Sequence, residues 1–350
     1  MMSRRPTITD IAIAAGVSKG AVSYALNGRP GVSAATRERI LAIAAEMGFV
    51  PNRAARSLSV SSAQAVGLAL CRDARTLGIE PYFMELISGI EATLSANSFG
   101  LTLQIVGSTE EELDVYRRWW AERRVDGVLL CDIKLSDPRP QAVAAMGLPA
   151  VAIGGPLAEP VIPFVWHDDV EPVWQVLRYL HTLGHRRIAR VAGIEGLLHT
   201  SIRDGAFDEP VGELGFENVE IVHGDYTGEE GARLTRRLLT SRPMPTAILY
   251  DNDVTAVAGL NVAHELGLKV PHDVSIVAWD DSPLCRLTHP SLTTLTRDIP
   301  SYGSKVSDLL LSVIGQEQSM ESRTFSVQCE PAQLLPRGST GPAPARTAVA

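Results

Sequence analysis

Residues 17–27 read VSKGAVSYALN, and this segment predicts the second helix of a helix-turn-helix. Ser18 is a preferred N-cap, and Gly16 just before the segment ends a first helix, because glycine adopts left-handed backbone without strain. The apolar residues Val22, Ala25 and Leu26 fall on one helical face. The opposite face is polar or small and carries Lys19, Gly20, Ser23 and Tyr24. The segment therefore predicts a short helix with one buried face and one face open to a partner.

Two more short helices flank this segment. A Thr-x-x-Asp capping box at Thr7 predicts where the first helix begins, and Ser33 caps a third helix that Gly48 ends. Apolar stripes at helical spacing are formed by Ile8, Ile11, Ala12 and Ala15 in the first helix and by Ile40, Ile43, Ala44 and Met47 in the third. Three such helices are typical of modules that lay their second helix in the major groove of DNA. A helical bundle used for packing or dimerisation has the same pattern, so both interpretations remain open at this point.

The distribution of charge favours DNA. Residues 1–63 carry eight basic side chains against three acidic ones, a net charge of +5. The whole chain carries −8, so residues 64–350 carry −13. A basic N-terminal part joined to an acidic remainder predicts phosphate binding at one end of the chain only, because the acidic part repels nucleic acid.

From Ala65 onward, short β-rich runs alternate with helical patterns. The expected strands are 66–70, 101–106, 127–130, 150–153, 188–192, 219–222, 247–250 and 275–278, and the expected helices are 83–97, 110–123, 173–183, 229–241 and 254–266. Apolar strands bounded by helices are typical of doubly wound parallel sheets covered on both faces. The units fall into two groups, about 65–163 and 164–295, which predicts two lobes with a ligand cleft at the carboxyl ends of their strands.

Candidate ligand-binding side chains follow these strands. Aromatic rings, an arginine, an amide and a carboxylate there suit a small hydroxyl-rich ligand, because rings stack on its apolar face while polar groups bind its hydroxyls. The candidates are Tyr82, Phe83, Arg203, Tyr226, Asn252 and Asp280. Each also has a purely structural interpretation, since Asn and Asp after strands cap helices and aromatic rings fill cores.

The sequence predicts no catalytic residues, no metal and no cofactor. His181 and His185 have the i, i+4 spacing of a metal pair, but Gly184 ends the expected helix between them, so a capping or solvated pair is favoured. Phosphate-loop, dinucleotide and serine-hydrolase motifs are missing. Asp251, Asp253, Asp280 and Asp281 offer carboxylates for glycoside chemistry, and we expect no partner with a raised pKa.

Cysteine spacing and hydropathy point to the cytoplasm. Cys71, Cys131, Cys285 and Cys329 lie far apart without a Cys-x-x-Cys pair, which favours reduced thiols. No signal peptide is recognisable at residues 1–5, and no apolar stretch approaches the ~18 residues of a membrane span. We therefore expect a cytoplasmic protein without a membrane partner.

Residues 7–58 contain several short motifs at fixed offsets, namely Thr9-Asp10-Ile11-Ala12, Ala15-Gly16-Val17-Ser18, Val22-Ser23, Leu26-Asn27, Val32-Ser33, Thr36-Arg37 and Phe49-Val50-Pro51-Asn52. With these motifs the segment resembles the N-terminal head of LacI/GalR-type transcriptional regulators. The resemblance implies DNA contacts from Thr7, Ser18, Lys19, Gly20, Ser23, Tyr24 and Asn27. It also implies a hinge helix that folds on the operator, with Asn52, Arg53, Ala55 and Arg56 near the DNA and Leu58 wedged into the minor groove. Tyr24 stands where many members have Arg, and Gly20 offers no side chain, so we expect a distinct operator.

The resemblance extends over the rest of the chain, to the periplasmic-binding-protein-like core of the family. It implies three crossings between the lobes, with 299–314 returning to the first lobe and a last strand near 333–337 in the second. Arg203, Asn252 and Asp280 match effector-contacting positions, whereas Gly154 replaces an Asp found in some relatives. Pro210 and Gly212 interrupt a segment where the family has a helix.

We therefore expect a multidomain repressor. A homodimer binds a pseudo-palindromic double-stranded operator, and a small-molecule carbohydrate effector in the cleft controls that binding; the alternative is a sugar-binding or sugar-processing protein with an accessory helical domain. The expected domains are an all-α helix-turn-helix head (1–51), a hinge and linker (52–64), an α/β core (65–337) and a flexible tail (338–350). Within the core, the first lobe comprises 65–163 with 298–322 and the second comprises 164–297 with 323–337.

Overall fold

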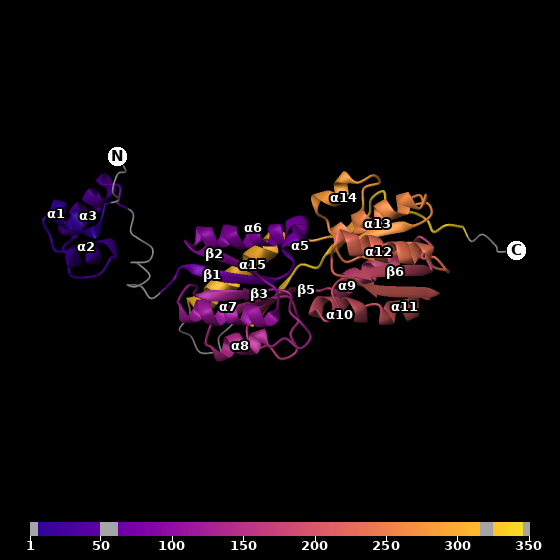
Figure 1. Cartoon of the computed structure of the whole chain (residues 1–350), viewed down its shortest axis with the longest axis horizontal. Helices are drawn as coiled ribbons and strands as arrows, with labels where there is room; N and C mark the ends of the chain where they lie inside the picture. The colour runs from indigo at the N-terminus through magenta and orange to yellow at the C-terminus, as the bar shows by residue number, and fades with distance from the viewer. Residues whose placement is uncertain (1–5, 50–61, 316–324, 346–350) are drawn as a thin grey trace. The chain divides into compact units, whose positions relative to one another are not determined.

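A computed structural model describes residues 6–49, 62–315 and 325–345 of the chain (Figure 1). The chain divides into two compact units, one ending at residue 63 and the other beginning at residue 64. Within the described ranges, no helix is both long and apolar enough to span a bilayer.

The smaller unit contains three helices whose caps are those predicted from the sequence. Thr7 closes a capping box with Asp10, in which each residue's backbone N–H donates to the other's side chain. The hydroxyls of Ser18 and Ser33 accept from the first turns of the next two helices, and Gly16 adopts the left-handed conformation with φ of 64°. The helices are α1 (Ile8–Ala15), α2 (Lys19–Leu26) and α3 (Ala34–Glu46). Their apolar stripes meet in one small core, which contains Ile11, Ala12, Ala15, Val22, Ala25, Ile40 and Ala44.

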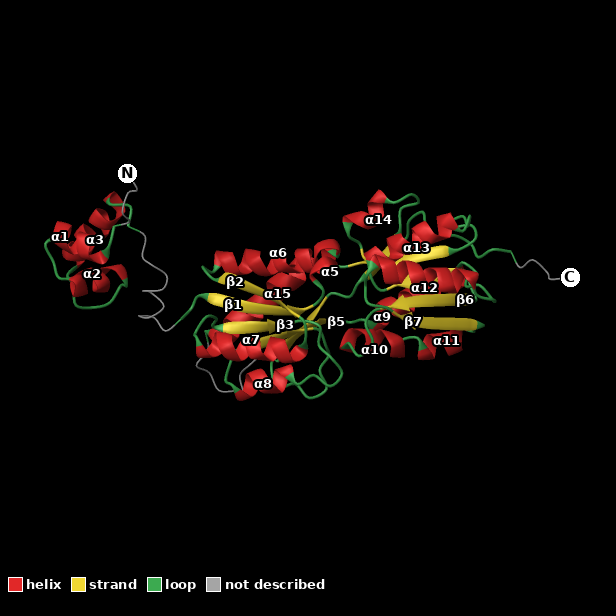
Figure 2. Ribbon diagram, viewed as in Figure 1, coloured by secondary structure: helices red, strands yellow, loops and turns green. Residues whose placement is uncertain are grey.

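The larger unit contains two six-stranded sheets among its described residues, each covered by helices on both faces (Figure 2). The first sheet has the order β11-β5-β4-β3-β1-β2, from β1 (Ala65–Cys71), β2 (Gly100–Val106), β3 (Gly127–Leu130), β4 (Ala150–Ile153), β5 (Phe164–His167) and β11 (Ser326–Cys329). The second has the order β12-β10-β9-β8-β6-β7, from β6 (Arg187–Ala192), β7 (Asn218–His223), β8 (Ala247–Tyr250), β9 (Ser275–Asp280), β10 (Thr293–Thr296) and β12 (Gln333–Leu335). Strand pairing is parallel except between β10 and β12.

Each sheet and its helices form a lobe. The first lobe adds α5 (Ala74–Ile79), α6 (Pro81–Ala96), α7 (Thr109–Ala121), α8 (Arg139–Ala145) and α15 (Ile299–Ile314). The second lobe adds α9 (Val170–Thr182), α10 (Leu198–Gly205), α11 (Asp208–Leu214), α12 (Gly228–Thr240), α13 (Asp253–Glu265) and α14 (Pro283–Leu287). The helix that the resemblance implied near Pro210 is divided into α10 and α11, with the break at residues 206–207.

Burial on both faces explains the continuous apolar strands. Along β1, Leu68 faces one core cluster and Ala69 faces the other. A Cβ on Gly67 would lie 2.5 Å from the Trp119 ring, so this strand position requires glycine for close packing against α7. The prediction of parallel sheets covered on two sides is confirmed.

Two expected lobe boundaries are wrong. Phe164–His167 pairs with β4 and Ser326–Cys329 pairs with β5, so both strands belong to the first lobe and not to the second. The error arose because β5 is followed directly by a second-lobe helix, whereas sheet membership depends on pairing with distant strands. The chain nevertheless crosses between the lobes three times, after β5, β10 and β11, and α15 packs on α6 in the first lobe as expected.

The expected flexible tail is also wrong for residues 338–345, which pack on the second lobe. Ser339 is fully buried, and its hydroxyl donates to the Ile276 carbonyl (2.6 Å) and accepts from the Thr293 N–H (2.8 Å). His185 is buried as well, and its ring contacts the Thr246 hydroxyl (2.9 Å) and the Gly341 carbonyl (3.1 Å). His185 is therefore neither a helix cap nor solvated, because its buried ring links Gly341 of the tail to Thr246, the residue before β8. Residues 346–350 lie outside the described part of the chain.

Candidate functional site

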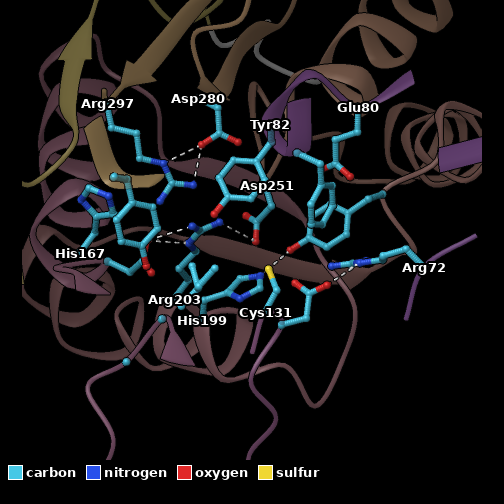
Figure 3. Close-up of a pocket in the computed structure, with 18 residues that line it drawn as sticks. Arg72, Glu80, Tyr82, Cys131, His167, His199, Arg203, Asp251, Asp280 and Arg297 are labelled. Atoms are coloured by element: carbon cyan, nitrogen blue, oxygen red, sulfur yellow. Dashed lines mark hydrogen bonds and ion pairs between the residues drawn. The ribbon is translucent and has the colours of Figure 1, made fainter. Parts of the chain in front are cut away.

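A cavity of about 70 Å³ lies between the two lobes, at the carboxyl ends of their strands (Figure 3). Five of the six expected ligand-binding residues line this inner cavity: Tyr82, Phe83, Arg203, Tyr226 and Asp280. The other residues of its lining are Arg72, Glu80, Cys131, Asp132, Ile153, Gly154, Gly155, His167, Asp169, His199, Asp251, Arg297 and Tyr302. Both lobes therefore contribute charged side chains to one site.

Arg203 is held in place by carboxylates on two sides. It lies on α10 and is 3 % exposed. Its Nε and Nη2 donate to one oxygen of Asp169 at 3.1 and 2.9 Å, and its Nη1 lies 3.6 Å from a carboxylate oxygen of Asp251. Burial by itself would raise the pKa of Asp169, but the charges of Arg203 and Arg297 and the Arg203 hydrogen bonds together keep that pKa below its usual value. The guanidinium also stacks on the Trp279 ring, 3.9 Å from its centroid.

Two further arginines of the lining form similar pairs. Arg297 Nε donates to Asp280 at 2.8 Å, and its guanidinium lies 5.4 Å from the centroid of the Tyr82 ring. Arg72 Nε donates to Asp132 at 2.7 Å, and its guanidinium lies 5.1 Å from the centroid of the Tyr226 ring. In each case an arginine of one lobe contacts an aromatic ring of the other.

Arg72, Asp132 and Arg297 were not predicted from the sequence. Arg72 and Asp132 follow β1 and β3 by one and two residues, so the strand-end rule that found Asp280 would also have found them. Arg297 follows β10 in the same way, but that strand of threonines and one leucine was not predicted.

Asn252 is not part of the lining. It is 2 % exposed, and its side-chain oxygen accepts from the Thr255 N–H (2.9 Å) as the N-cap of α13. Its amide group donates to Glu80 at 3.3 Å and to the Tyr226 carbonyl at 3.2 Å. Asn252 therefore lies behind the cavity and positions two residues that line it.

Glu80 and Asp253 correct the expectation that no carboxyl group in this region has a raised pKa. Burial raises the pKa of each to about 7. Glu80 Oε2 has no hydrogen-bond partner among the described residues. Burial raises the pKa of Asp251, by contrast, less than its partners lower it: the charge and hydrogen bonds of Arg190, together with the charge of Arg203, bring that pKa down to about 2.

Two histidines of the lining are neutral near physiological pH. Burial lowers the pKa of both His167 and His199 to about 4. His199 Nε2 lies 2.9 Å from the Tyr226 hydroxyl, and His167 Nδ1 lies 2.9 Å from the Glu330 carbonyl. The other nitrogen of His167, Nε2, is buried and has no partner within the described residues.

Backbone hydrogen bonds join the lobes directly. The Leu198 N–H donates to the Ile133 carbonyl at 2.8 Å, and the Leu135 N–H donates to the Gly196 carbonyl at 3.1 Å. Together with the bridge between Lys134 and Leu197, they connect the loop after β3 to the loop after β6. The loop that contributes Asp132 to the lining is thus tied to the loop that leads into α10, the helix of His199 and Arg203.

In the smaller unit, α2 presents the face predicted from the sequence. Ser18, Lys19 and Gly20 are exposed, Tyr24 is 44 % exposed, and Ser23 is half-buried. The Thr7 hydroxyl and Asn27 amide are already engaged, with Asp10 and with the Ser23 carbonyl respectively. The expected DNA contacts Asn52, Arg53, Ala55, Arg56 and Leu58 lie outside the described residues.

Comparisons with known proteins match both units. The model of the lacI family of bacterial regulatory proteins matches residues 7–52, and that of the periplasmic binding protein-like domain matches residues 177–340. The HTH-type transcriptional regulator CelR of Thermobifida fusca is 33 % identical over 90 % of this chain and 93 % of its own length. The HTH-type transcriptional repressor CytR of Escherichia coli is 29 % identical, covering 95 % of this chain and 96 % of its own length. A solved structure of the transcriptional regulator CelR with cellobiose superimposes with a TM-score of 0.72 at 30 % identity, over 96 % of this chain and all of that one.

Proposed function

The chain belongs to the lacI family of bacterial regulatory proteins, and from this membership we propose that it is a repressor controlled by a carbohydrate bound between its lobes. As a member of this family it is a DNA-binding transcriptional regulator and not an enzyme. The observation that carries the proposal is the inner cavity, where paired arginines and aromatic rings from both lobes surround one small space. Repression is supported by the similarity to CytR, which is a repressor.

The DNA side of the proposal rests on the exposed face of α2. Two chains form a homodimer in the cytoplasm and present two such helices to successive major grooves, about 34 Å apart along a pseudo-palindromic operator. Lys19, Ser23 and Tyr24 contact bases or phosphates from this face. By the family resemblance, Leu58 enters the minor groove between the half-sites.

The proposal of an effector that controls DNA binding is supported by ligand contacts that come from both lobes. Arg72 and Tyr82 belong to the first lobe, and Arg203 and Tyr226 belong to the second. Arg297 directly follows β10 of the second lobe, in the connection to α15. A ligand that touches both sets stabilises one relative arrangement of the lobes over others, which is the differential binding that an allosteric switch needs. A coupling free energy of ~1–3 kcal/mol changes operator affinity by about 5- to 150-fold. The cellobiose bound to CelR supports a carbohydrate as the class of ligand.

Fluorescence anisotropy on a labelled promoter fragment tests the proposal. We expect the full-length protein to bind in a salt-dependent manner, and one sugar of a panel to change its affinity at least about fivefold. Leu58→Ala is expected to weaken operator binding and reduce DNA bending, whereas Arg203→Ala is expected to bind DNA normally and lose the response to sugar. If Arg203→Ala bound the sugar as tightly as the unmodified protein in calorimetry, the proposed effector site would be wrong.

A further inference from the structure

We propose, on the basis of the carbohydrate effector proposed above, that the ligand is an uncharged saccharide of at least two linked units that extends beyond the inner cavity. A second cavity of about 450 Å³, called the outer cavity here, adjoins the inner one. Its lining consists of Cys71, Arg72, Asp73, Thr76, Ile79, Glu80, Ile194, Asp225, Tyr226, Thr227, Gly228, Glu229 and Val254. Both lobes contribute to this lining, as they do to that of the inner cavity.

Three residues, Arg72, Glu80 and Tyr226, line both cavities. They therefore form the junction at which the two cavities adjoin, and the proposed ligand crosses from one to the other there. In Figure 3, Arg72 and Glu80 lie at one end of the inner cavity, and His167 and Arg297 lie at the opposite end. A ligand that begins beside His167 reaches the outer cavity at the junction.

The two volumes indicate a ligand of more than one unit. At ~10–15 Å³ for each water position, the inner cavity holds roughly five to seven waters, which is on the order of one sugar ring. The outer cavity falls within the range of about 300–1,000 Å³ that small-molecule sites occupy. Ile79, which is 63 % exposed, and Ile194 give it apolar surface for the face of a second ring.

The charges of the inner cavity indicate that the ligand is neutral. Its arginines are already paired, Arg72 with Asp132, Arg203 with Asp169 and Arg297 with Asp280, so a phosphate would have to displace a carboxylate. The remaining carboxyl groups are no better suited to a cation. Asp251 is bound by Arg190, and the pKa of Glu80 is raised by burial.

The outer cavity disfavours anions as well. The acidic side chains of Asp225 and Glu229 line it, and the guanidinium of Arg72 in the same lining is already paired with Asp132. A sugar phosphate or sugar acid placed there would face like charges in a partly buried space.

At each end of the inner cavity, one residue of the lining carries a buried polar atom with no hydrogen-bond partner among the described residues. Because His167 is neutral and its Nδ1 faces the Glu330 carbonyl, Nδ1 carries the proton and Nε2 accepts. A ligand hydroxyl that donates to Nε2 would satisfy this buried group. Glu80 Oε2 is unpartnered at the junction, where a saccharide continues into its second unit.

Calorimetry on the full-length dimer tests the proposal with a defined panel of sugars. The panel contains glucose, galactose, mannose and xylose, their β-1,4- and α-1,4-linked homodisaccharides and lactose, glucose 6-phosphate, glucosamine and chitobiose. We expect a neutral disaccharide to bind at least tenfold more tightly than its component monosaccharide, and glucose 6-phosphate not to bind. Ile194→Trp, which places a larger side chain in the outer cavity where the second unit would lie, is expected to remove the tenfold advantage of the disaccharide. Leu287→Trp, on the 81 % exposed Leu287 of α14, is the matched control and should retain it.

Each remaining outcome overturns one proposal in particular. A monosaccharide, a phosphorylated sugar or an amino sugar as the tightest ligand would overturn the neutral two-unit ligand but leave a carbohydrate effector in place. An unchanged disaccharide preference in Ile194→Trp would overturn the placement of the second unit. Operator binding with no response to any member of the panel would overturn the carbohydrate effector itself.

Discussion

The two lobes share one order of strands, yet a buried arginine supports the inner cavity in a different way in each. In the first lobe Arg139 pairs with Glu112 at 2.8 Å and with Asp137, and its Nη2 donates to the backbone carbonyl of Asp132. In the second lobe Arg190 pairs with Asp204 and, through two bonds of 2.8 and 2.7 Å, with the Asp251 carboxylate. Arg139 therefore holds only the main chain of a residue in the lining, whereas Arg190 neutralises a side chain of the lining itself.

Because of this difference, we expect Arg139 to affect the stability of the fold alone and Arg190 to affect both stability and ligand binding. Asp251 lies 3.6 Å from Arg203, so any change in its charge reaches a guanidinium that faces the ligand. Arg139 has no such contact with a lining side chain among its described hydrogen bonds. The same arrangement, a buried arginine among carboxylates, thus supports the fold in the first lobe and supports both the fold and the ligand site in the second.

The largest effect is expected from removing these arginines one at a time. Arg190→Met and Arg139→Met should each lower the free energy of unfolding by about 3–5 kcal/mol, because each removes the nearest counter-charge and the hydrogen bonds of a buried carboxylate. Effector affinity should fall at least about tenfold in Arg190→Met, equivalent to ~1.4 kcal/mol, and change less than about threefold in Arg139→Met. Urea denaturation and calorimetry measure the two quantities. Equal losses of affinity in both variants would refute the distinction between the lobes.

A pH-dependent effect is expected at Glu80 in the first lobe. Burial raises its pKa from the ordinary 4.5 to about 7, which corresponds to roughly 3 kcal/mol of preference for the protonated form. Between pH 4.5 and 7 the unfolded chain releases this proton while the folded chain keeps it, so the free energy of unfolding falls as pH rises through this window. Glu80→Gln removes that dependence.

The gain in stability of Glu80→Gln over the unmodified protein should therefore be larger at pH 8 than at pH 5, by up to about 3 kcal/mol. His167 and His199, whose pKa values are lowered to about 4, destabilise both proteins equally as pH falls below 6.5, so they cancel in the difference. Thermal unfolding of both proteins at the two pH values provides the measurement. A difference that does not depend on pH would show that Glu80 is ionised in the folded protein.

A smaller effect should be confined to the second lobe, because only that lobe is covered by residues 338–345. Ser339→Ala leaves the Thr293 N–H and the Ile276 carbonyl without their buried partner, at a cost of about 1–3 kcal/mol. Hydrogen exchange should then increase in β9 and β10 while β1 and β3 remain protected. Increased exchange in both lobes would mean that the tail stabilises the larger unit as a whole.

The smallest effect is expected from exposed ion pairs, in which the lobes should not differ. Arg117 pairs with Asp114 in the first lobe and Arg237 pairs with Glu220 in the second, and the arginine side chains are 58 and 57 % exposed. Replacing either arginine by Ala should change the free energy of unfolding by less than about 1 kcal/mol, because water screens the pair. Chemical denaturation measures this change. A larger loss of unfolding free energy in one variant than in the other would indicate that surface charges also distinguish the lobes.

The helices of the smaller unit could be predicted closely because their signals are local. Thr7 and Ser18 cap helices within three residues of themselves, and Gly16 sits where the left-handed conformation is needed. The rule that binding residues follow strands also predicted Arg203, Tyr226 and Asp280, which line the inner cavity. The same rule selected Asn252, which instead caps α13 behind the cavity. Helix capping and ligand binding both use an asparagine directly after a strand, so the sequence does not distinguish them.

The sequence by itself determined the caps, the apolar faces and the alternation of strands with helices, because each of these depends on residues a few positions apart. Only the tertiary structure decided that Phe164–His167 joins the first lobe, that Arg72, Asp132 and Arg297 meet at one cavity, and that Ser339 is buried. Glu80 illustrates the reason. Its raised pKa and unpartnered oxygen arise from burial beside Asn252, which is 172 positions away in the chain. Such environments depend on long-range packing, which local sequence patterns do not encode.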